Sequence, residues 1–392
     1  MTWRVLAAGT LARVPSEGIA LAVVLTVTGR GGSTAFAGLL LALTTLPQVV
    51  TGPLGGSLLD RATRPGRVVA AAAMVAAAAL TALAVGDGAG VWAVCAALVL
   101  AGADPILTGG LSATFTRWAE PGGLSAHTVS AWDGVAYNVA GVAGPLVVTI
   151  VAAAAGPAAA LGALAAVIAP TAVIALGGPQ LPVTAHAGGL RALAALRAMW
   201  ADRPLRGVTV ATTVEQAALG GMTIALVAAA AAHGHAAEAA GTVLTVRAVT
   251  ALASSLALTR WGATVAPLTI VSASVAAGGV GLVVMGLVPW WLLVGVAAVV
   301  GLADGPVLVG TYRARADGSP PNLRASVFTV GASLKLAASS AGSLMAGVAL
   351  ADRSTSGGLV VIGAVCLAGT AAGRMAGRPG QVPTDRAENS AF

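Results

Sequence analysis

The segment most informative about the fold of this chain is Gly55-Gly56-Ser57-Leu58-Leu59-Asp60-Arg61-Ala62-Thr63-Arg64-Pro65-Gly66-Arg67. It joins two apolar runs, near residues 34–59 and 68–85, and each run is long enough to cross a bilayer at ~1.5 Å per helical residue. Gly56 lies one helical turn before Asp60, and a glycine there lets a second helix approach closely. An acid at a helix C-terminus is locally unfavourable. We therefore expect Asp60 to have its partner on another helix.

The composition places the chain among membrane proteins. Hydrophobic residues make up 57% and charged residues 9%, with a mean hydropathy of +0.90, which is outside the range of a soluble domain. The net charge of +7 does not indicate nucleic-acid binding, because the arginines lie in short segments between apolar runs and not in a stripe interleaved with aromatics. Cys95 and Cys366 fall in separate apolar runs, so we expect buried thiols and no disulfide. The richness in arginine and alanine, with Lys335 the only lysine, is typical of a high-GC bacterial genome.

The apolar runs predict an all-α integral membrane protein with about twelve transmembrane helices. Arg13 and Glu17 interrupt the first run and no convincing cleavage site follows it, so it is expected to be a retained helix and not a signal peptide. The predicted spans lie near residues 4–27, 34–59, 68–85, 90–115, 125–151, 156–176, 205–232, 237–259, 264–288, 289–312, 323–350 and 357–374.

These spans divide into two bundles of six, residues 1–178 and 205–376. Between them we expect a cytoplasmic linker, residues 179–204, in which Leu190, Leu193, Leu196 and Trp200 follow a helical period. That period predicts an amphipathic helix on the inner membrane surface. The polar tail, residues 377–392, is expected to be disordered.

The arginines are distributed unequally between the two sides of the predicted helices. The side opposite the N-terminus carries only Arg30 and Arg353, an asymmetry of about eightfold, which predicts cytoplasmic termini and linker in a bacterial inner membrane. The side that holds the N-terminus carries Arg4, Arg61, Arg64, Arg67, Arg117, Arg191, Arg197, Arg203, Arg206, Arg260, Arg313, Arg315, Arg324, Arg374, Arg378 and Arg386.

The two halves also repeat short patterns. Asp104-Pro105 in the fourth run recurs as Asp304-Gly305-Pro306 in the tenth, and Glu17 in the first run has a counterpart in Glu215 of the seventh. The charged segment has a second copy without its acid, Arg260-Trp261-Gly262. A six-plus-six duplication of this kind builds a site at the membrane midplane between two halves.

Charged residues inside the predicted spans follow a period of three helices. The third, sixth, ninth and twelfth spans have no charge until Arg374, whereas the first, fourth, seventh and tenth each carry an acid. Because a charge facing lipid costs several kcal/mol, we expect helices one, four, seven and ten to line a cavity. The candidate cavity and proton-coupling residues are Arg13, Glu17, Asp104, Asp133, Glu215, Arg247, Asp304 and Lys335.

Each candidate also has a structural interpretation. Arg13 and Glu17, four residues apart, can simply neutralise each other. Asp104 can satisfy backbone groups that a helix kink at Pro105 leaves without partners. Lys335 lies too deep to reach the surface easily, so an acid partner is expected. Asp133 and Glu215 lie nearer the arginine-rich ends and can belong to gating ion pairs.

Sequence motifs for catalysis or metal binding are weak. His233, His235 and Glu238 resemble a zinc cluster only loosely, because structural zinc prefers four well-spaced ligands. We find no glycine-rich nucleotide loop after a strand, no hydrolase triad spacing and no ATPase signature. We therefore expect neither an enzyme nor a cofactor or metal, with a proton gradient as the energy source.

The charged segment resembles the loop signature between helices two and three of the major facilitator superfamily, and the resemblance extends over residues 4–374. Gly102-Ala103-Asp104-Pro105 with Arg117-Trp118 is similar to the fourth-helix ending of an actinobacterial drug-efflux-like branch. The stretch 137–145 is similar to a helix-five motif of exporters, but it lacks the trailing glycine pair, and the fourth-helix arginine of many drug–proton antiporters is missing. The residues that the resemblance assigns are the gating loop Gly56, Asp60, Arg61, Arg64 and Arg67 and the helix-five motif Gly141, Gly144 and Pro145.

The resemblance implies a secondary transporter that works by alternating access. Our first expectation is proton-coupled export of a small amphiphilic or cationic compound by a monomer in the lipid bilayer, because acids outnumber bases inside the spans. A metabolite importer and a transporter-like sensor that moves no substrate remain open. We further expect Asp60 to close the cytoplasmic side by facing the N-terminus of helix eleven near 322–324, where backbone N–H groups are exposed.

Overall fold

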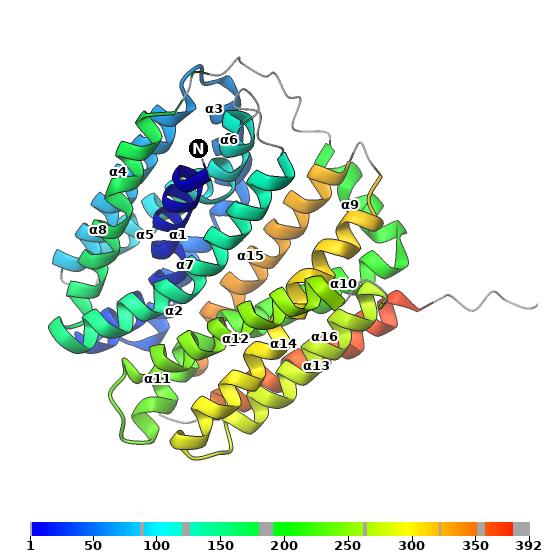
Figure 1. The fold of residues 1–392 in the computed structure, drawn as a ribbon. Helices are drawn as coiled ribbons and strands as arrows, with labels where there is room; N and C mark the ends of the chain where they lie inside the picture. Colours follow the sequence, from blue (N-terminus) through cyan, green and yellow to red (C-terminus); the bar gives the residue numbers. More distant parts are fainter. Residues whose placement is uncertain are drawn as a thin grey trace, which may run out of the picture.

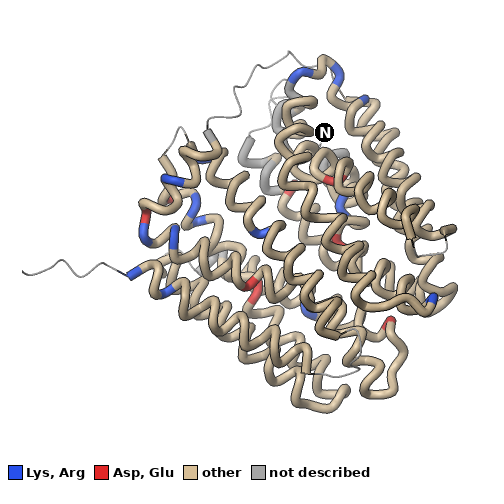
Figure 2. The backbone as a smooth tube through the Cα atoms, turned by 180° about the vertical axis from the view of Figure 1, so that it is seen from behind, with Lys and Arg blue, Asp and Glu red and all other residues tan. Residues whose placement is uncertain are grey.

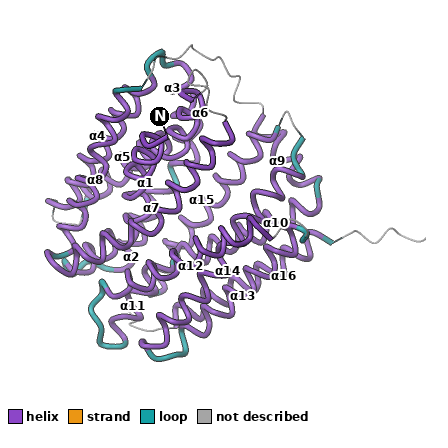
Figure 3. Tube along the Cα trace, viewed as in Figure 1, coloured by secondary structure: helices purple, strands orange, loops and turns teal. Residues whose placement is uncertain are grey.

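The computed structural model describes residues 2–86, 90–119, 126–178, 180, 191–261, 265–320, 323–350 and 357–378. Over these residues the chain forms helices and no strands (Figures 1 and 3), which confirms the all-α prediction. Most of the linker up to residue 190 and the tail beyond residue 378 lie outside the described residues, so the predicted disorder of the tail stays a prediction.

The first six spans contain one interrupted and one locally widened helix. The second span breaks at Leu46 and Pro47, and the fourth passes through a π-helical turn after Pro105. The helices of this half are α1 (Thr2–Gly29), α2 (Thr34–Thr45), α3 (Gln48–Arg61), α4 (Pro65–Val85), α5 (Val91–Pro105), the π-helix η1 (Ile106–Gly110), α6 (Leu111–Ala119), α7 (Ala126–Ala155) and α8 (Pro157–Leu176).

The second half begins with the linker helix α9 (Arg191–Ala201) and has its own broken span, where two helices meet at an angle of 41° at Gly221. Ten described helices are long and apolar enough to cross a membrane, and this bent pair adds an eleventh span. The 26-residue α15 is long enough for a twelfth. The helices of this half are α10 (Arg203–Gly220), α11 (Met222–Ala232), α12 (Ala239–Trp261), α13 (Pro267–Met285), α14 (Trp290–Asp317), α15 (Arg324–Ala349) and α16 (Gly357–Gly377).

The same helix pairs pack together in both halves. In the first half α1 packs on α7 and α8, and α4 packs on α8 and α5. In the second half α10 packs on α15 and α16, and α13 packs on α16 and α14, which are the corresponding pairs. The two halves therefore form two pseudo-symmetric six-helix bundles, which lie side by side in Figure 1.

Glycines allow close helix crossings in corresponding places of the two bundles. A Cβ atom on Gly144 of α7 would lie 2.7 Å from the backbone nitrogen of Gly18 on α1. In the second bundle, a Cβ atom on Gly342 of α15 would overlap the carbonyl of Ala217 on α10. Small residues of this kind let transmembrane backbones approach. The helix-five motif is thus a packing device in both halves, with serines and one glycine in the second copy.

The bundles join near the helix ends that lie away from the Arg61 loop. The Thr34 hydroxyl donates to the Gly347 carbonyl at 3.0 Å, which ties α2 to α15. Gly241 of α12 packs against Thr149 of α7. We call this side the joined face. The other side, where most lysine and arginine residues gather at the helix ends (Figure 2), is the arginine-rich face.

The structure also describes the two cysteines and the linker helix α9. Both cysteines are free, but Cys95 is exposed on its helix and only Cys366 is buried, so the expected burial of Cys95 is wrong. The linker helix α9 buries Ala195 and Met199 and leaves Leu193 and Trp200 exposed. The predicted amphipathic role of this helix on the membrane surface stays a prediction.

Candidate functional site

A cavity of about 340 Å³ lies between the two bundles. Its walls come from α1, α7, α11, α12 and α14, which are the first, fifth, seventh, eighth and tenth spans. The expectation that the fourth span lines this cavity is wrong, because Asp104 faces into its own bundle instead. The polar lining residues are Glu17, Tyr137, Asn138, Thr223, Arg247, Ser255 and Asp304.

The cavity is closed toward the joined face and accessible on the other side. Leu21, one turn beyond Glu17 on α1, is only 1% exposed and packs beside Gly241. Tyr137, which lines the cavity, is by contrast 49% exposed. In this conformation the cavity therefore opens toward the arginine-rich face.

Arg13 forms its ion pair with Asp133 and not with Glu17. Its Nη2 lies 2.8 Å from Asp133 Oδ1 and 2.5 Å from the Ser112 hydroxyl, and its guanidinium lies 5.6 Å from the centre of the Tyr137 ring. Arg13 is 1% exposed, so its charge needs several partners. Arg13 also donates to the carbonyls of Gly9 and Thr108.

Glu17 is consequently the cavity acid without a salt bridge to any described residue. Its neighbour is the side chain of Tyr137, with which it interacts directly. A carboxylate in an apolar wall that has a hydroxyl partner and no cation can bind either a proton or a positively charged guest.

Arg247 and Asp304 form a charged pair that lines the cavity, unlike Arg13 and Asp133, which are not among the lining residues. Arg247 Nε lies 2.5 Å from Asp304 Oδ2, and the pair links α12 to α14. Glycines make this approach possible, because a Cβ atom on Gly305 would lie 2.6 Å from the backbone nitrogen of Ser255. The repeated Asp-Pro pattern of the sequence thus does not place its two acids equivalently, since Asp304 lines the cavity between the bundles and Asp104 does not.

Glu215 and Lys335 interact across the second bundle. Glu215 on α10 is 5% exposed, and Lys335 on α15 is close enough to act on it electrostatically, but no ion pair within 4.0 Å joins the two. That Glu215 is the acid partner of Lys335 stays a prediction. Neither side chain is among the lining residues of the central cavity.

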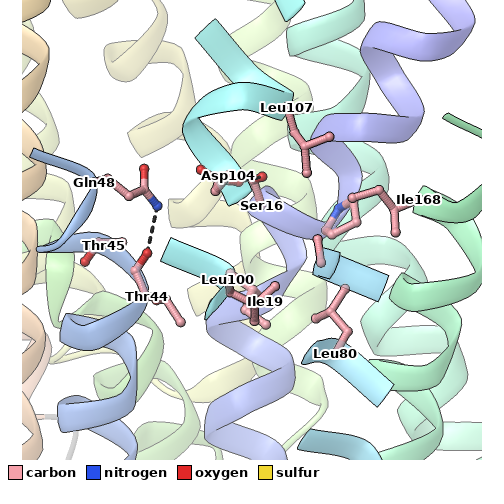
Figure 4. A pocket seen from close by; sticks show the side chains of 12 residues that line it. Ser16, Ile19, Thr44, Thr45, Gln48, Leu80, Leu100, Asp104, Leu107 and Ile168 are labelled. Atoms are coloured by element: carbon pink, nitrogen blue, oxygen red, sulfur yellow. Dashed lines mark hydrogen bonds between the residues drawn. The ribbon is translucent and has the colours of Figure 1, made fainter. Parts of the chain in front are cut away.

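Asp104 lies in a separate cavity of about 60 Å³ inside the first bundle (Figure 4). The Ser16 hydroxyl donates to Asp104 Oδ1, and Gln48 of α3 faces the same carboxylate. Sequence reasoning missed Ser16 and Gln48, although each is a polar residue within an apolar run. The Asp104 carbonyl accepts from Thr108 at 2.9 Å, which supports the kink at Pro105 as well.

The gating loop is described only in part. Arg61, Arg64 and Arg67 are exposed. The side chain of Asp60 and residue 322 lie outside the described residues, so their expected contact stays a prediction. A Cβ atom on Gly56 would meet no atom within 4 Å. The expected close approach at Gly56 is absent in this conformation.

The histidines of the outer loop pack on an aromatic ring. His235 stacks on Trp290, with ring centres 5.1 Å apart, and His233 lies 6.1 Å from the same ring. Among the described residues no group of three or more His, Cys, Asp or Glu is placed to hold a metal ion.

No protein-family model and no curated protein sequence matches this chain. Solved structures do match: a variant of the nucleoside transporter NupG aligns with a TM-score of 0.74 and 14% identity, over 96% of this chain and 98% of that one. An auto-inhibited POT family peptide transporter aligns with a TM-score of 0.70 and 13% identity, over 97% of each chain. At this identity the likeness shows the fold, and it is the major facilitator fold that the sequence predicts.

Proposed function

We propose that this chain, built on the major facilitator fold, is a secondary active transporter that works by alternating access. The observation that carries the proposal is the charged cavity between two pseudo-symmetric bundles, closed at the joined face and open on the other side. Rocking of the bundles about such a site exposes it to each side of the membrane in turn. The fold of its structural neighbours supports the same function.

The lining favours a small amphiphilic cation as substrate. Glu17 offers a negative charge without a salt bridge, and Leu244, Leu252 and Leu308 provide an apolar surface. A proton and a cationic substrate would compete for the Glu17 carboxylate. Mutual exclusion at one carboxylate is sufficient for antiport, because the inward proton and the outward substrate cannot be bound together.

The decisive experiment is transport in proteoliposomes with an imposed pH gradient. We expect cationic amphiphiles to move against the proton flow, and Glu17→Gln to abolish gradient-driven movement while substrate exchange continues. Asn138→Ala, also in the cavity but without a charge, serves as the control and should keep the coupling. Gradient-driven pumping by Glu17→Gln at every pH would remove this carboxylate from the mechanism.

Import of a metabolite is the second candidate, and Arg247 is the observation that favours it. Its guanidinium lines the cavity and could bind a carboxylate or phosphate if Asp304 released it. A peptide carries such a carboxylate, and one structural neighbour is named as a peptide transporter. Uptake in the direction of an inward proton gradient would identify import, and absence of any flux would favour a sensor.

A resistance profile in an efflux-deficient bacterial host tests the direction of transport in cells. Export predicts a rise in the minimum inhibitory concentration of cationic amphiphiles and no change for neutral compounds. A rise that is equal for both classes would contradict selection by charge.

A further inference from the structure

The cavity around Asp104 has a polar wall and an apolar wall. Figure 4 shows Gln48, Thr44, Thr45, Ser16 and Asp104 together on one side. The opposite wall consists of Leu80, Leu100, Leu107 and Ile168. An ionised carboxylate in such a place is costly unless a cation or a proton compensates it.

No described lysine, arginine or histidine forms an ion pair with Asp104. The nearest candidate on α1 is Arg13, whose guanidinium is held by Asp133 and Ser112. Among the described residues, the direct partners of the Asp104 carboxylate are the neutral side chains of Ser16 and Gln48.

The donor hydrogens of the polar wall are directed at protein acceptors, and the second N–H of the Gln48 amide faces Asp104 itself. The Thr44 hydroxyl donates to the Leu41 carbonyl at 2.8 Å, and Gln48 Nε2 donates to the Thr44 carbonyl at 2.7 Å. Thr45 donates to the Leu41 carbonyl at 3.0 Å, and Ser16 donates to Asp104 itself. What remains available to a guest is oxygen lone pairs, which hard cations prefer.

Interruptions in two transmembrane helices lie next to this cavity. Thr44, Thr45 and Gln48 flank the interruption of the second span, and Asp104 directly precedes the π-helical turn of the fourth. Interrupted transmembrane helices are where coupling ions are held, and π-helical turns are frequent at functional sites.

We propose that this cavity is a Na⁺ site, with Asp104 as the charged ligand and Ser16, Thr45 and Gln48 as neutral oxygen ligands. One carboxylate matches one positive charge, and a space of about 60 Å³ suits a small ion with a few waters at ~10–15 Å³ each. The site lies outside the substrate cavity, so Na⁺ would not compete with the substrate directly.

Thr45 connects the site to the bundle interface. Its hydroxyl lies 2.6 Å from that of Ser340 on α15. An ion that is coordinated by the Thr45 hydroxyl therefore alters a contact between the bundles. This coupling role rests on the proposed transport function, whereas the binding itself does not.

The test is Na⁺ binding to the purified protein, measured by equilibrium dialysis with radioactive Na⁺ and by thermal unfolding. We expect a higher Tm in NaCl than in KCl or choline chloride of equal ionic strength. Asp104→Asn and Gln48→Leu should each lose this Na⁺-specific rise, and Glu17→Gln, which changes the acid of the other cavity, should keep it.

Two results would overturn the Na⁺ site. One is an equal Tm in all three salts at every pH tested, which would mean that Asp104 carries only a proton. The other is an Asp104→Asn protein that binds Na⁺ as the wild type does. Na⁺ binding without any transport would contradict the proposed function alone, and transport without Na⁺ binding would contradict this site alone.

Discussion

The stability of a charged side chain inside the membrane depends on its partners, and Arg13 is an example. It is 1% exposed and holds Asp133, Ser112 and two backbone carbonyls. Removing one partner of a buried pair costs about 3–5 kcal/mol, because the other charge is left uncompensated. Arg13→Ala should therefore lower the Tm strongly in detergent.

The control for this prediction is the double variant Arg13→Ala with Asp133→Ala. It should be less destabilised than the sum of the two single changes, since it leaves no unpaired charge. Arg197→Ala, at an exposed position of α9, should have little effect. Strict additivity of the two single changes would show that the pair does not act as a unit.

Spacing alone could not identify the partner of Arg13. Glu17 is on the same helix at the i+4 position, which is an ordinary ion-pair spacing, and Asp133 is 120 residues away in the chain. The choice depends on the crossing of α1 and α7. That crossing is visible in the sequence only as a Gly-Pro motif without an assigned neighbour.

At the scale of elements, the α1–α7 crossing depends on Gly144. An added methyl group would lie 2.7 Å from the backbone of α1, and such overpacking costs roughly 1–3 kcal/mol. Gly144→Ala should therefore lower the Tm. Gly134→Ala on the same helix meets no atom within 4 Å and should be neutral or stabilising, since alanine favours a helix. Similar Tm values for both variants would refute close packing at Gly144.

The apolar runs predicted the helices well, but not their interruptions. The runs at 34–59 and 205–232 each read as one span, whereas the structure divides the first at Pro47 and the second at Gly221. Proline and paired glycines are visible breakers. Whether they kink a helix or end it depends on the neighbours that accept the freed backbone groups, such as Gln48, which donates to the Thr44 carbonyl.

At the scale of the whole molecule, the expected gate can be tested by its distance change. In the described conformation a Cβ atom on Gly56 of α3 would meet no atom within 4 Å, so no other helix packs against α3 at this glycine. If Asp60 faces the N-terminus of α15 in the closed state, the contact is worth ~0.3–2 kcal/mol. Asp60→Asn should then shift the population by about 2–30-fold toward the open arginine-rich face.

Spin labels at positions 54 and 324 report this equilibrium. We expect the short-distance population of the wild type to diminish in Asp60→Asn, whereas Ser57→Ala, on the exposed side of the same helix end, should leave it unchanged. An unaltered distance distribution in Asp60→Asn would mean that this carboxylate is not part of the gate.

The charge pattern predicted which helices avoid lipid, but not the direction in which they face. Asp104 and Asp304 occupy matching positions in the repeat, yet only Asp304 reaches the cavity between the bundles. A polar face can be turned toward a partner bundle or toward the interior of its own. That choice is set by helix rotation and crossing, which the period of three helices does not contain.

The low apolarity of α15 has a consequence for how the protein enters the membrane. Lys335 lies near the middle of this helix, among five serines, and a lysine at a helix centre adds about 2.5–3.5 kcal/mol to the free energy of translocon insertion. The segment should insert poorly when it is presented alone to the translocon, and Lys335→Leu should restore its insertion in a glycosylation-mapping assay. During biogenesis α15 would then wait in the translocon channel until α10, which carries Glu215, is beside it.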